Sequence, residues 1–316
     1  MIIPCYNESE VFPTSLEQLR KILIELIDTK QIAPNSYLLF VDDGSTDNTW
    51  ECIQSAVKNF PDFVYGLKLS RNCGHQSALL AGIQQVDTDI SISIDADLQD
   101  DIQAIPQMVQ AYQQGAEIVY GVRAERHTDT LFKRFSAKIF YKLMTLMGVE
   151  QIENHADFRL LGKQARAALL QYSEHNLYLR GIIPKLGFPS TQVYYKRISR
   201  QQGESKYPLK KMLSLALEGI TSFTITPLRL ISILGLLICL VTIFVTCYVL
   251  WAKFSGNVIS GWTSVILAIF FFGGVQLLSL GVIGEYIGKI YLESKKRPKY
   301  FIEHSNLEEK YGDKNA

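Results

Sequence analysis

The sequence predicts an α/β domain followed by two membrane-spanning helices, and three observations support this fold class. Over residues 1–205, apolar strand-like segments alternate with polar helical segments. No charged residue occurs from Leu230 to Trp251. A second apolar run extends from Gly261 to Gly284. Each run has about the 20 residues that a helix needs to cross the hydrocarbon core of a bilayer.

Composition and charge narrow the class of protein. The 316-residue chain has a formal net charge of +1, which does not suit a general nucleic-acid binder. Its five cysteines form no CxxC pair, so we expect neither a zinc site nor a disulfide framework, and we expect a reducing compartment. No signal peptide is visible, because Met1 leads directly into the first strand, and we expect a few native residues ahead of it.

The basic residues around the two apolar runs predict how the chain is oriented. Lysines and arginines precede the first run and follow the second, whereas the linker between the runs has only Lys253. Positive charge stays on the cytoplasmic side, so both ends and the whole first domain are expected in the cytoplasm. Two buried helices of a soluble domain are the alternative, but such helices seldom run this far without a charge. We therefore expect spans at about 228–251 and 262–286, within 228–288, and a basic, polar tail over 289–316 that frays from residue 303.

Two further segments have the pattern of helices that lie on a membrane surface. Residues 131–147 place apolar side chains at helical spacing, with Arg134, Lys138 and Lys142 on another face. Basic and apolar faces together suit a helix in the headgroup region. The juxtamembrane segment 206–227 contains a similar stripe. An ordinary core helix explains either stripe alone nearly as well, and the two predicted spans favour the membrane surface.

Residues 37–50 combine an apolar strand, a carboxylate pair, a Gly-Ser turn and the start of a helix. Ligands of open α/β sheets bind beyond the carboxyl ends of the strands. Asp42 and Asp43 are expected at that position, where they could accept hydrogen bonds from a base or a ribose. The alternative is a turn in which Asp47 or Thr46 only caps the next helix.

Residues 93–100 read SIDADLQD and repeat this pattern on a later strand. An Asp-x-Asp unit offers oxygen donors for one hard divalent cation and leaves other positions to substrate phosphates, as magnesium prefers. Asp95, Asp97 and the amide oxygen of Gln99 are expected to face the metal. Asp-x-Asp alone is a weak motif, but its place after a strand and the earlier Asp pair make the prediction strong.

Six segments carry a resemblance to a known family: PCYNE, VDDGSTDNT, SRNCGHQSALLAG, IDADLQD, NHADFRLL and RQQGESKYPLK, in this order along the chain. They resemble the polyprenyl-phosphate glycosyltransferases of glycosyltransferase family 2, the inverting group that includes dolichyl-phosphate mannose synthases. With two C-terminal spans, the chain is most similar to bacterial bactoprenol (undecaprenyl-phosphate) glucosyltransferases. The resemblance implies a GT-A (Rossmann-like) catalytic domain over 1–205, followed by amphipathic interface helices and two transmembrane helices.

The resemblance also implies roles for individual residues. Mg²⁺ or Mn²⁺ bridging the donor diphosphate is implied at Asp95, Asp97 and Gln99. Asp157 matches a catalytic aspartate that orients groups, bridges to an arginine such as Arg159, or takes a residual proton, and these alternatives stay open. The residues that match the acceptor-phosphate site are Arg123, Arg134 and Ser136. The residues that match the nucleotide-sugar site are Pro4, Tyr6, Glu8, Asp42, Asp43 and Asp95, with Arg200 and Lys206 on a loop that closes on the diphosphate.

The reaction implied is inverting transfer of a hexose, with glucose favoured, from a UDP-sugar to polyprenyl (undecaprenyl) phosphate at the inner (plasma) membrane. A lipid phosphate, with its second pKa of ~6, is mostly dianionic and needs no strong base. Mannose from GDP-mannose or an amino sugar are alternatives, and juxtamembrane helices could pair between protomers in a homo-oligomer. A processive polysaccharide synthase would carry Gln-x-x-Arg-Trp, yet no tryptophan follows an arginine here. An inactive membrane-anchored binding protein would be expected to have lost its acidic pairs.

Overall fold

The computed structural model describes residues 1–124, 155–172, 174, 179–195, 226–255 and 262–307. The described residues form two compact units. The first unit contains the described residues up to 195 together with 297–307. The second unit contains 226–255 and 262–296. Each unit is described by itself below.

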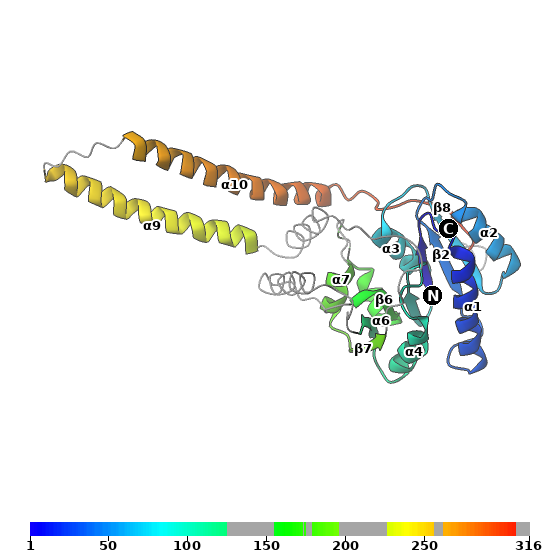
Figure 1. Ribbon diagram of the computed structural model, residues 1–316. Helices are drawn as coiled ribbons and strands as arrows, with labels where there is room; N and C mark the ends of the chain where they lie inside the picture. The colour runs from blue at the N-terminus through cyan, green and yellow to red at the C-terminus, as the bar shows by residue number, and fades with distance from the viewer. Residues whose placement is uncertain (125–154, 173, 175–178, 196–225, 256–261, 308–316) are drawn as a thin grey trace. The chain divides into compact units, whose positions relative to one another are not determined.

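The first unit is built around one mixed sheet of eight strands in the order β7-β5-β6-β4-β1-β2-β3-β8 (Figure 1). Strand β1 pairs in parallel with β2 and β4, and β2 pairs in parallel with β3. Strand β6 runs antiparallel between β4 and β5. The strands are β1 Ile2–Cys5, β2 Leu38–Asp42, β3 Val64–Leu69, β4 Ile90–Ser93, β5 Ile118–Arg123, β6 His155–Gly162, β7 Ser190–Tyr195 and β8 Ile302–Ser305. The predicted α/β domain is confirmed.

Helices connect the parallel strands, and their apolar faces form the core with the sheet. The longest, α1, buries Leu19, Ile22, Leu23 and Leu26, which recur at helical spacing. Strands β1 and β2 are buried along their whole length, as expected for parallel strands covered on both faces. The helices of this unit are α1 Phe12–Asp28, α2 Thr49–Asn59, α3 His75–Gln85, α4 Ile105–Gln113, α6 Lys163–Leu169 and α7 Leu179–Ile182, with 3₁₀ turns η1 Ile102–Ala104 and η2 Ile183–Leu186.

The strand order brings the predicted functional segments to one edge of the sheet. The chain passes outward from β1 to β3 and then returns to β4 on the other side of β1. This reversal is the switch point at which open α/β sheets bind ligands. Because β6 is antiparallel to β4, with Ser93 in register with Arg159, the start of β6 lies beside the carboxyl end of β4. Asp157 therefore shares an edge with the segments that follow β1, β2 and β4.

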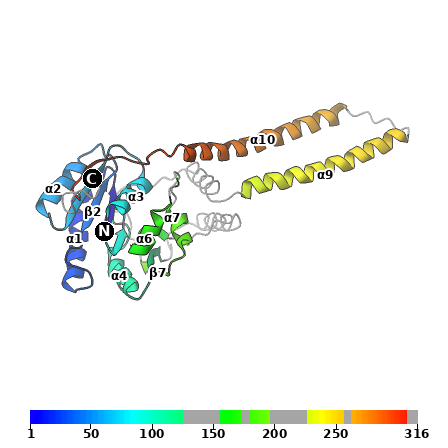
Figure 2. The same cartoon turned by 180° about the vertical axis from the view of Figure 1, so that it is seen from behind.

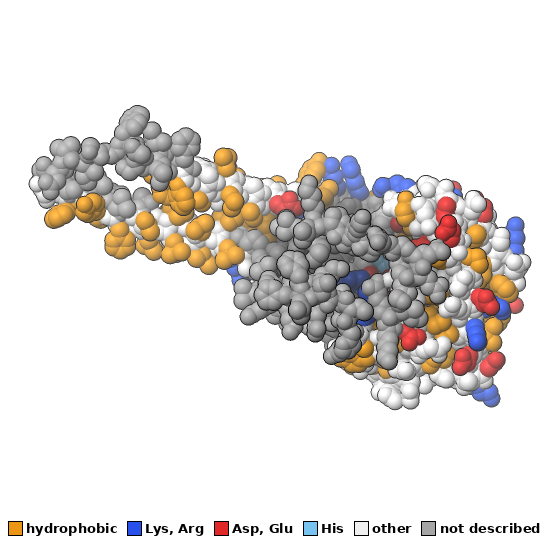
Figure 3. Space-filling model, viewed as in Figure 1, with side chains coloured by type: hydrophobic (Ala, Val, Ile, Leu, Met, Phe, Trp, Pro, Cys, Tyr) orange, Lys and Arg blue, Asp and Glu red, His pale blue; other side chains and the backbone are white. Residues whose placement is uncertain are grey.

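The second unit contains two long apolar helices, α9 Thr226–Phe254 and α10 Trp262–Ser294. They lie side by side in both views (Figure 2), and hydrophobic side chains line their surface (Figure 3). Helix α10 continues beyond the predicted end of the second span at 286. Within the described residues, the stretch Phe271–Ser294 is long and apolar enough to cross a membrane, whereas the apolar stretch Leu228–Ile238 is shorter.

The prediction that the chain frays from residue 303 is wrong for the segment up to 307. Strand β8 pairs antiparallel with β3, and Leu307 is only 2 % exposed. The open edge of a sheet presents unpaired backbone groups, and this returning segment satisfies those of β3. The predicted surface helices at 131–147 and 206–227 lie outside the described residues, as does the end of the tail after 307.

Candidate active site

A cavity of about 330 Å³ opens at the switch point between β1 and β4. It is formed by the carboxyl ends of these strands, the end of β2 and the segment that leads into α3. Six residues predicted for the nucleotide and metal sites line it together. Its lining residues are Pro4, Cys5, Tyr6, Glu8, Asp43, Asn72, Gly74, His75, Ala78, Asp95, Ala96 and Asp97.

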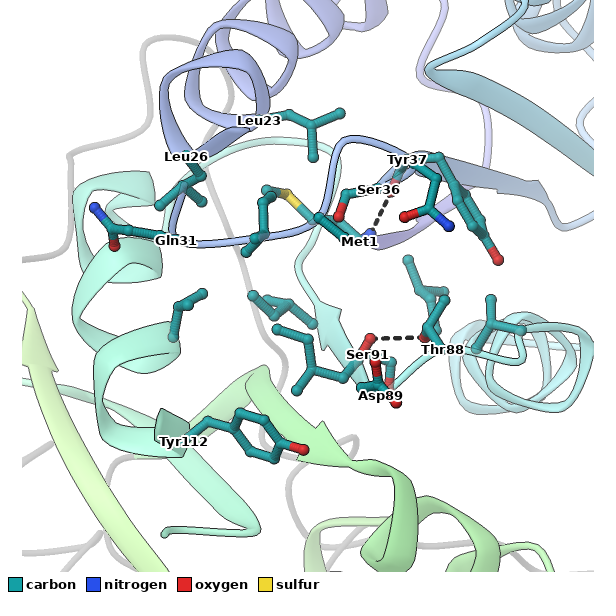
Figure 4. Close-up of a pocket in the computed structure, with 18 of the residues that line it drawn as sticks. Met1, Leu23, Leu26, Gln31, Ser36, Tyr37, Thr88, Asp89, Ser91 and Tyr112 are labelled. Carbon is teal, nitrogen blue, oxygen red and sulfur yellow. Dashed lines mark hydrogen bonds between the residues drawn. The ribbon is translucent and has the colours of Figure 1, made fainter. Parts of the chain in front are cut away.

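A second cavity of similar volume lies at the opposite ends of the same strands (Figure 4). It is lined by the starts of β1 and β4 and by the end of α1, where the Met1 amine donates to the Tyr37 carbonyl at 2.7 Å. Its lining, within the described residues, includes none of the predicted site residues. Since parallel sheets bind ligands at their carboxyl ends, the first cavity is the candidate site.

Two loops that border the cavity hold each other through backbone and side-chain hydrogen bonds. Asn7 has a φ of 54°, and its amide donates to the Ser45 hydroxyl at 3.0 Å. The Asp47 carboxylate accepts from the amides of Ser9 and Thr49, both at 3.1 Å. Burial works against the charge, but hydrogen bonds from Ser9 and Thr49 lower the pKa of Asp47 to about 2. The N-cap residue of α2 is Asn48, and Asp47 instead bonds the first helical residue, Thr49, while it also fixes the loop after β1.

The two carboxylates at the carboxyl end of β2, Asp42 within the strand and Asp43 just after it, have different surroundings. Asp43 is buried and accepts from the amides of Cys73 at 2.7 Å and Gly74 at 2.9 Å. Asp42 is fully buried; one oxygen accepts from the Ser45 amide at 3.3 Å, and its Oδ2 has no hydrogen-bond partner among the described residues. Burial raises the pKa of both carboxyls. Asp43 thus anchors the loop before α3 and lines the cavity. Asp42 lies behind that lining, with one buried oxygen that has no hydrogen-bond partner among the described residues.

The Asp-x-Asp turn after β4 contains one residue in a strained backbone conformation. Leu98 adopts a φ of 46°, which is rare for a bulky side chain. The Asp97 carboxylate accepts from the Gln99 amide at 3.2 Å. Asp95 Oδ1 is buried without a hydrogen-bond partner in the described part of the chain, although His75 Nε2 lies 3.4 Å away as an ion-pair partner. Burial raises the pKa of Asp95.

This donor set fits a hard divalent cation that takes its remaining ligands from substrate. Two carboxylates and a neighbouring amide match the oxygen ligands that magnesium prefers, with phosphate or water in the other positions. No group of three His, Cys, Asp or Glu side chains among the described residues could hold a metal alone.

Asp157, at the start of β6, is the centre of a buried polar network. Its carboxylate accepts from Arg159, from Arg180 through two bonds of 3.2 and 2.9 Å, and from Gln76 at 3.4 Å. His75 Nε2 lies 3.5 Å from it. Burial opposes the charge, but the hydrogen bond from His75 and the charges of Arg159 and Arg180 hold the pKa of Asp157 well below its usual range. These contacts favour the orienting and bridging roles over that of a proton acceptor.

Arg123 ends β5 at the predicted edge, but its guanidinium is engaged. Its Nε and a terminal nitrogen lie 3.0 and 2.9 Å from one oxygen of Asp100, to which the Tyr195 hydroxyl also donates at 2.7 Å. Asp100 is buried, and the Arg123 side chain is 21 % exposed. The structure thus ties Arg123 to the segment that follows the Asp-x-Asp turn.

Three residues of this site, Gln76, Asp100 and Arg180, were not predicted from the sequence. Gln76 lies in the segment SRNCGHQSALLAG and Asp100 in SIDADLQD, so these two segments could have indicated them, whereas Arg180 belongs to no recognised motif. The predicted residues that lie outside the described part of the chain are Arg134, Ser136, Arg200 and Lys206.

An acidic cavity at the switch point of an open α/β sheet is typical of enzymes that act on nucleotide-linked substrates. Among such enzymes this chain is a glycosyltransferase. Residues 1–165 match the family described as glycosyl transferase family 2, and the chain belongs to that family.

Its relatives share nearly its whole length. The "uncharacterized glycosyltransferase YkoT" of Bacillus subtilis is 49% identical over 96% of this chain and 90% of its own. The bactoprenol glucosyl transferase of Shigella phage SfV and the prophage bactoprenol glucosyl transferase homolog of Escherichia coli K12 are both 37% identical, over 96% of this chain and 97% of theirs. A solved glucosyl-3-phosphoglycerate synthase from Mycobacterium tuberculosis shares 17% identity at a TM-score of 0.46, over 70% of this chain and 75% of its own.

Proposed function

We propose that this glycosyltransferase transfers glucose from UDP-glucose to a polyprenyl phosphate, with inversion at the anomeric carbon. The observation that carries the proposal is the acidic turn at the end of β4, where Asp95 and Asp97 line the switch-point cavity. A diphosphate donor with a divalent cation suits such a turn. Two relatives named as bactoprenol glucosyl transferases, similar over nearly their full length, support the lipid phosphate as acceptor.

Asp95 and Asp97 would hold Mg²⁺ or Mn²⁺, with Gln99 close by. The buried Asp95 oxygen, which has no hydrogen-bond partner among the described residues, is stabilised as a carboxylate once a cation lies beside it. When bound, the metal supplies Lewis-acid neutralisation of the charge that builds on the leaving diphosphate. Within the chain, Leu98, with its positive φ, directly follows the segment whose two carboxylates line the cavity.

The donor nucleotide would occupy the side of the cavity formed by Pro4, Tyr6 and Glu8. The Tyr6 side chain is 45 % exposed there, which suits stacking against a base. Asp42 Oδ2 is the acceptor best suited to a hydroxyl or N–H group of the nucleotide, because its hydrogen-bonding capacity is unused within the described residues. Asp43 would act through the loop that it anchors.

The acceptor would attack as a phosphate dianion, so the reaction needs cations more than it needs a base. An ionised Asp157 agrees with this, because its role becomes holding Arg180, whose side chain is 38 % exposed. We include Arg180 among the residues that meet the acceptor or leaving phosphate, since a guanidinium forms strong charge-assisted bonds to phosphate. Arg123, Arg134 and Ser136 remain the other acceptor candidates, and Arg200 and Lys206 the candidates for closure over the diphosphate.

Two membrane crossings agree with the position of β8. Strands β3 and β8 are neighbours in one sheet, so residues 64–69 and 302–305 lie on one side of any membrane. The chain between them must then cross an even number of times. A single crossing by α10 would place β8 on the opposite side of the membrane from β3. We therefore take α9 as the second membrane-spanning helix. The basic residues that flank the pair favour the cytoplasmic side for the catalytic unit, in a multi-pass plasma-membrane protein.

The test is a transfer assay with the full chain, labelled UDP-glucose and undecaprenyl phosphate, followed by lipid extraction. The expected product is a lipid that carries one glucose, formed only with a divalent cation and lost on chelation. A labelled polymer would indicate a processive synthase, and label from GDP-mannose alone would indicate another donor. No transfer from any donor would refute the proposal.

A further inference from the structure

The segment that follows α10 contains β8, which pairs with β3 at the edge of the sheet. We propose that β8 is a positioning element for the donor site, which holds the loop at residues 70–74 in the conformation that fixes Asp43. The proposal rests on the proposed function only in treating the switch-point cavity as the donor site. Its other steps are contacts within the first unit.

Strand β8 is joined to β3 up to the point where the site loop begins. Lys68 is in register with His304 and Leu69 with Ile302. The pairing then continues past the strand, because the Ser70 amide donates to the carbonyl oxygen of residue 301 at 2.9 Å. The first residue of the loop is therefore held directly by the returning chain.

Side chains show that this edge is a built interface. The His304 ring packs edge-on against Trp50 of α2, with ring centroids 5.6 Å apart, and Lys68 lies on the same tryptophan at 5.9 Å. Leu307 is almost fully buried just beyond the strand. In β3, a Cβ at Gly66 would come within 2.8 Å of Ile53, so the strand is pressed closely against α2. Two of these contacts, those of His304 and Leu307, are made by residues that follow α10.

From Ser70 the effect reaches the cavity within four residues. The amides of Cys73 and Gly74 donate to the Asp43 carboxylate, as described above. The turn after Asp43 fits tightly against the same loop, because a Cβ at Gly44 would lie 2.4 Å from the backbone of Arg71. The loop thus has little freedom between its β8-held start and its carboxylate-held end.

The returning chain also contacts the helix that the loop enters. The Tyr300 hydroxyl donates to the side-chain oxygen of Gln84, near the end of α3. Helix α3 begins at His75, which lies between Asp95 and Asp157. Residues 300–307 therefore hold both the start of the loop and the far end of α3. We therefore expect donor binding to depend on residues 300–307, which follow α10 along the chain.

The test compares two truncations of the full chain. Removal of residues 308–316 leaves β8 intact and is the matched control; removal of 299–316 deletes it. We expect the control to bind UDP with Mn²⁺ within twofold of the full chain. We expect the longer deletion to raise the Kd at least tenfold and to speed hydrogen exchange of the 70–74 amides at least tenfold, with β1 and β2 unchanged. Unchanged affinity and unchanged loop exchange would overturn the proposal.

A disulfide crosslink tests the proposal independently if deletion of residues 299–316 unfolds the whole sheet. Leu307→Asp should loosen β8 in the full chain, and Lys68→Cys with His304→Cys places a cysteine pair across the two strands. We expect oxidation of the triple variant to restore UDP affinity and loop protection to within threefold of the full chain, whereas the variants with one introduced cysteine stay impaired. A formed crosslink without restored loop protection would overturn the proposal. If the intact chain binds no UDP, the proposed function fails, and the exchange rates still test the role of β8.

Discussion

Replacing Asp157 by alanine should destabilise the catalytic unit severely, because it leaves a buried charge without its partner. The Arg159 side chain is 1 % exposed, and one of its terminal nitrogens already lacks a hydrogen-bond partner among the described residues. Breaking a buried ion pair by removing one partner costs about 3–5 kcal/mol. The second arginine, Arg180, is 38 % exposed and can regain water, so it should add little to this cost.

The control is Asp157→Ala combined with Arg159→Met, which removes both charges and fills the space with an apolar side chain. Such replacement of a whole buried pair is often neutral, so the double variant should unfold within about 1 kcal/mol of the parent. Urea unfolding can be followed by the fluorescence of Trp50 in a variant in which Trp251 and Trp262 are replaced by phenylalanine. Both variants should lose transfer. If Asp157→Ala alone costs less than about 1 kcal/mol, the anchoring role is wrong and Asp157 acts in the chemistry.

The pH dependence follows from the lowered pKa of Asp157. A carboxyl whose folded pKa is depressed contributes stability that is present above its unfolded pKa of about 3.9 and is lost as the pH falls through the folded value. Because Asp157 also helps to raise the pKa of His75, against the effect of burial, both proteins should carry His75→Gln. In that background the stability difference between the parent and Asp157→Asn should stay constant from about pH 5 to pH 8. A difference that titrates near neutrality would show that Asp157 exchanges a proton there.

Three further predictions test the site and the topology. Asp97→Ala should abolish metal-dependent transfer while the fold is retained, and full activity or insensitivity to chelator would contradict this. Arg180→Ala should lower kcat/KM about 10- to 100-fold through loss of a charge-assisted bond of about 1.5–3 kcal/mol, and Arg180→Lys should recover little of it; unchanged kinetics for both would exclude a phosphate contact. A cysteine placed at position 257 should react with an impermeant label from outside sealed cells, and one at position 315 should not; the reverse pattern would invert the orientation.

The edge of the sheet that carries the site could be predicted from the sequence because its determinants are local. Strand periodicity locates each carboxyl end, and parallel pairing brings those ends together, so Asp43, Asp95 and Asp97 were placed correctly at one cavity. Arg123 was also placed at the correct edge. Its partner Asp100 was not predicted, because periodicity does not show which of several neighbouring carboxylates an arginine will meet.

The contacts that the sequence did not reveal join segments that are distant along the chain. Arg180 meets Asp157 from a short helix 23 residues away, and no local pattern marks that pairing. Lys68 pairs with Glu303 across 235 residues. Strand β8 has a polar composition typical of a tail, and it becomes a strand only because β3 leaves an open edge beside it. Edge pairing of this kind depends on the assembled sheet, which a local pattern does not contain.

The distribution of unsatisfied oxygens explains why so many carboxylates can share one edge and what they are arranged to bind. Asp43 is satisfied by backbone amides, Asp100 by an arginine and a tyrosine, and Asp157 by two arginines. Within the described residues, Asp42 and Asp95 each keep one buried oxygen without a hydrogen-bond partner. Burying a carboxylate oxygen without a hydrogen-bond partner costs free energy, and this cost falls when a hydrogen-bond donor or a cation binds to the oxygen. Under the proposed function, Asp42 at the end of β2 suits a hydroxyl or N–H donor, whereas Asp95, near Asp97, suits a divalent cation. Under the proposed function, the nucleotide and its cation would together relieve the two unsatisfied oxygens at this edge.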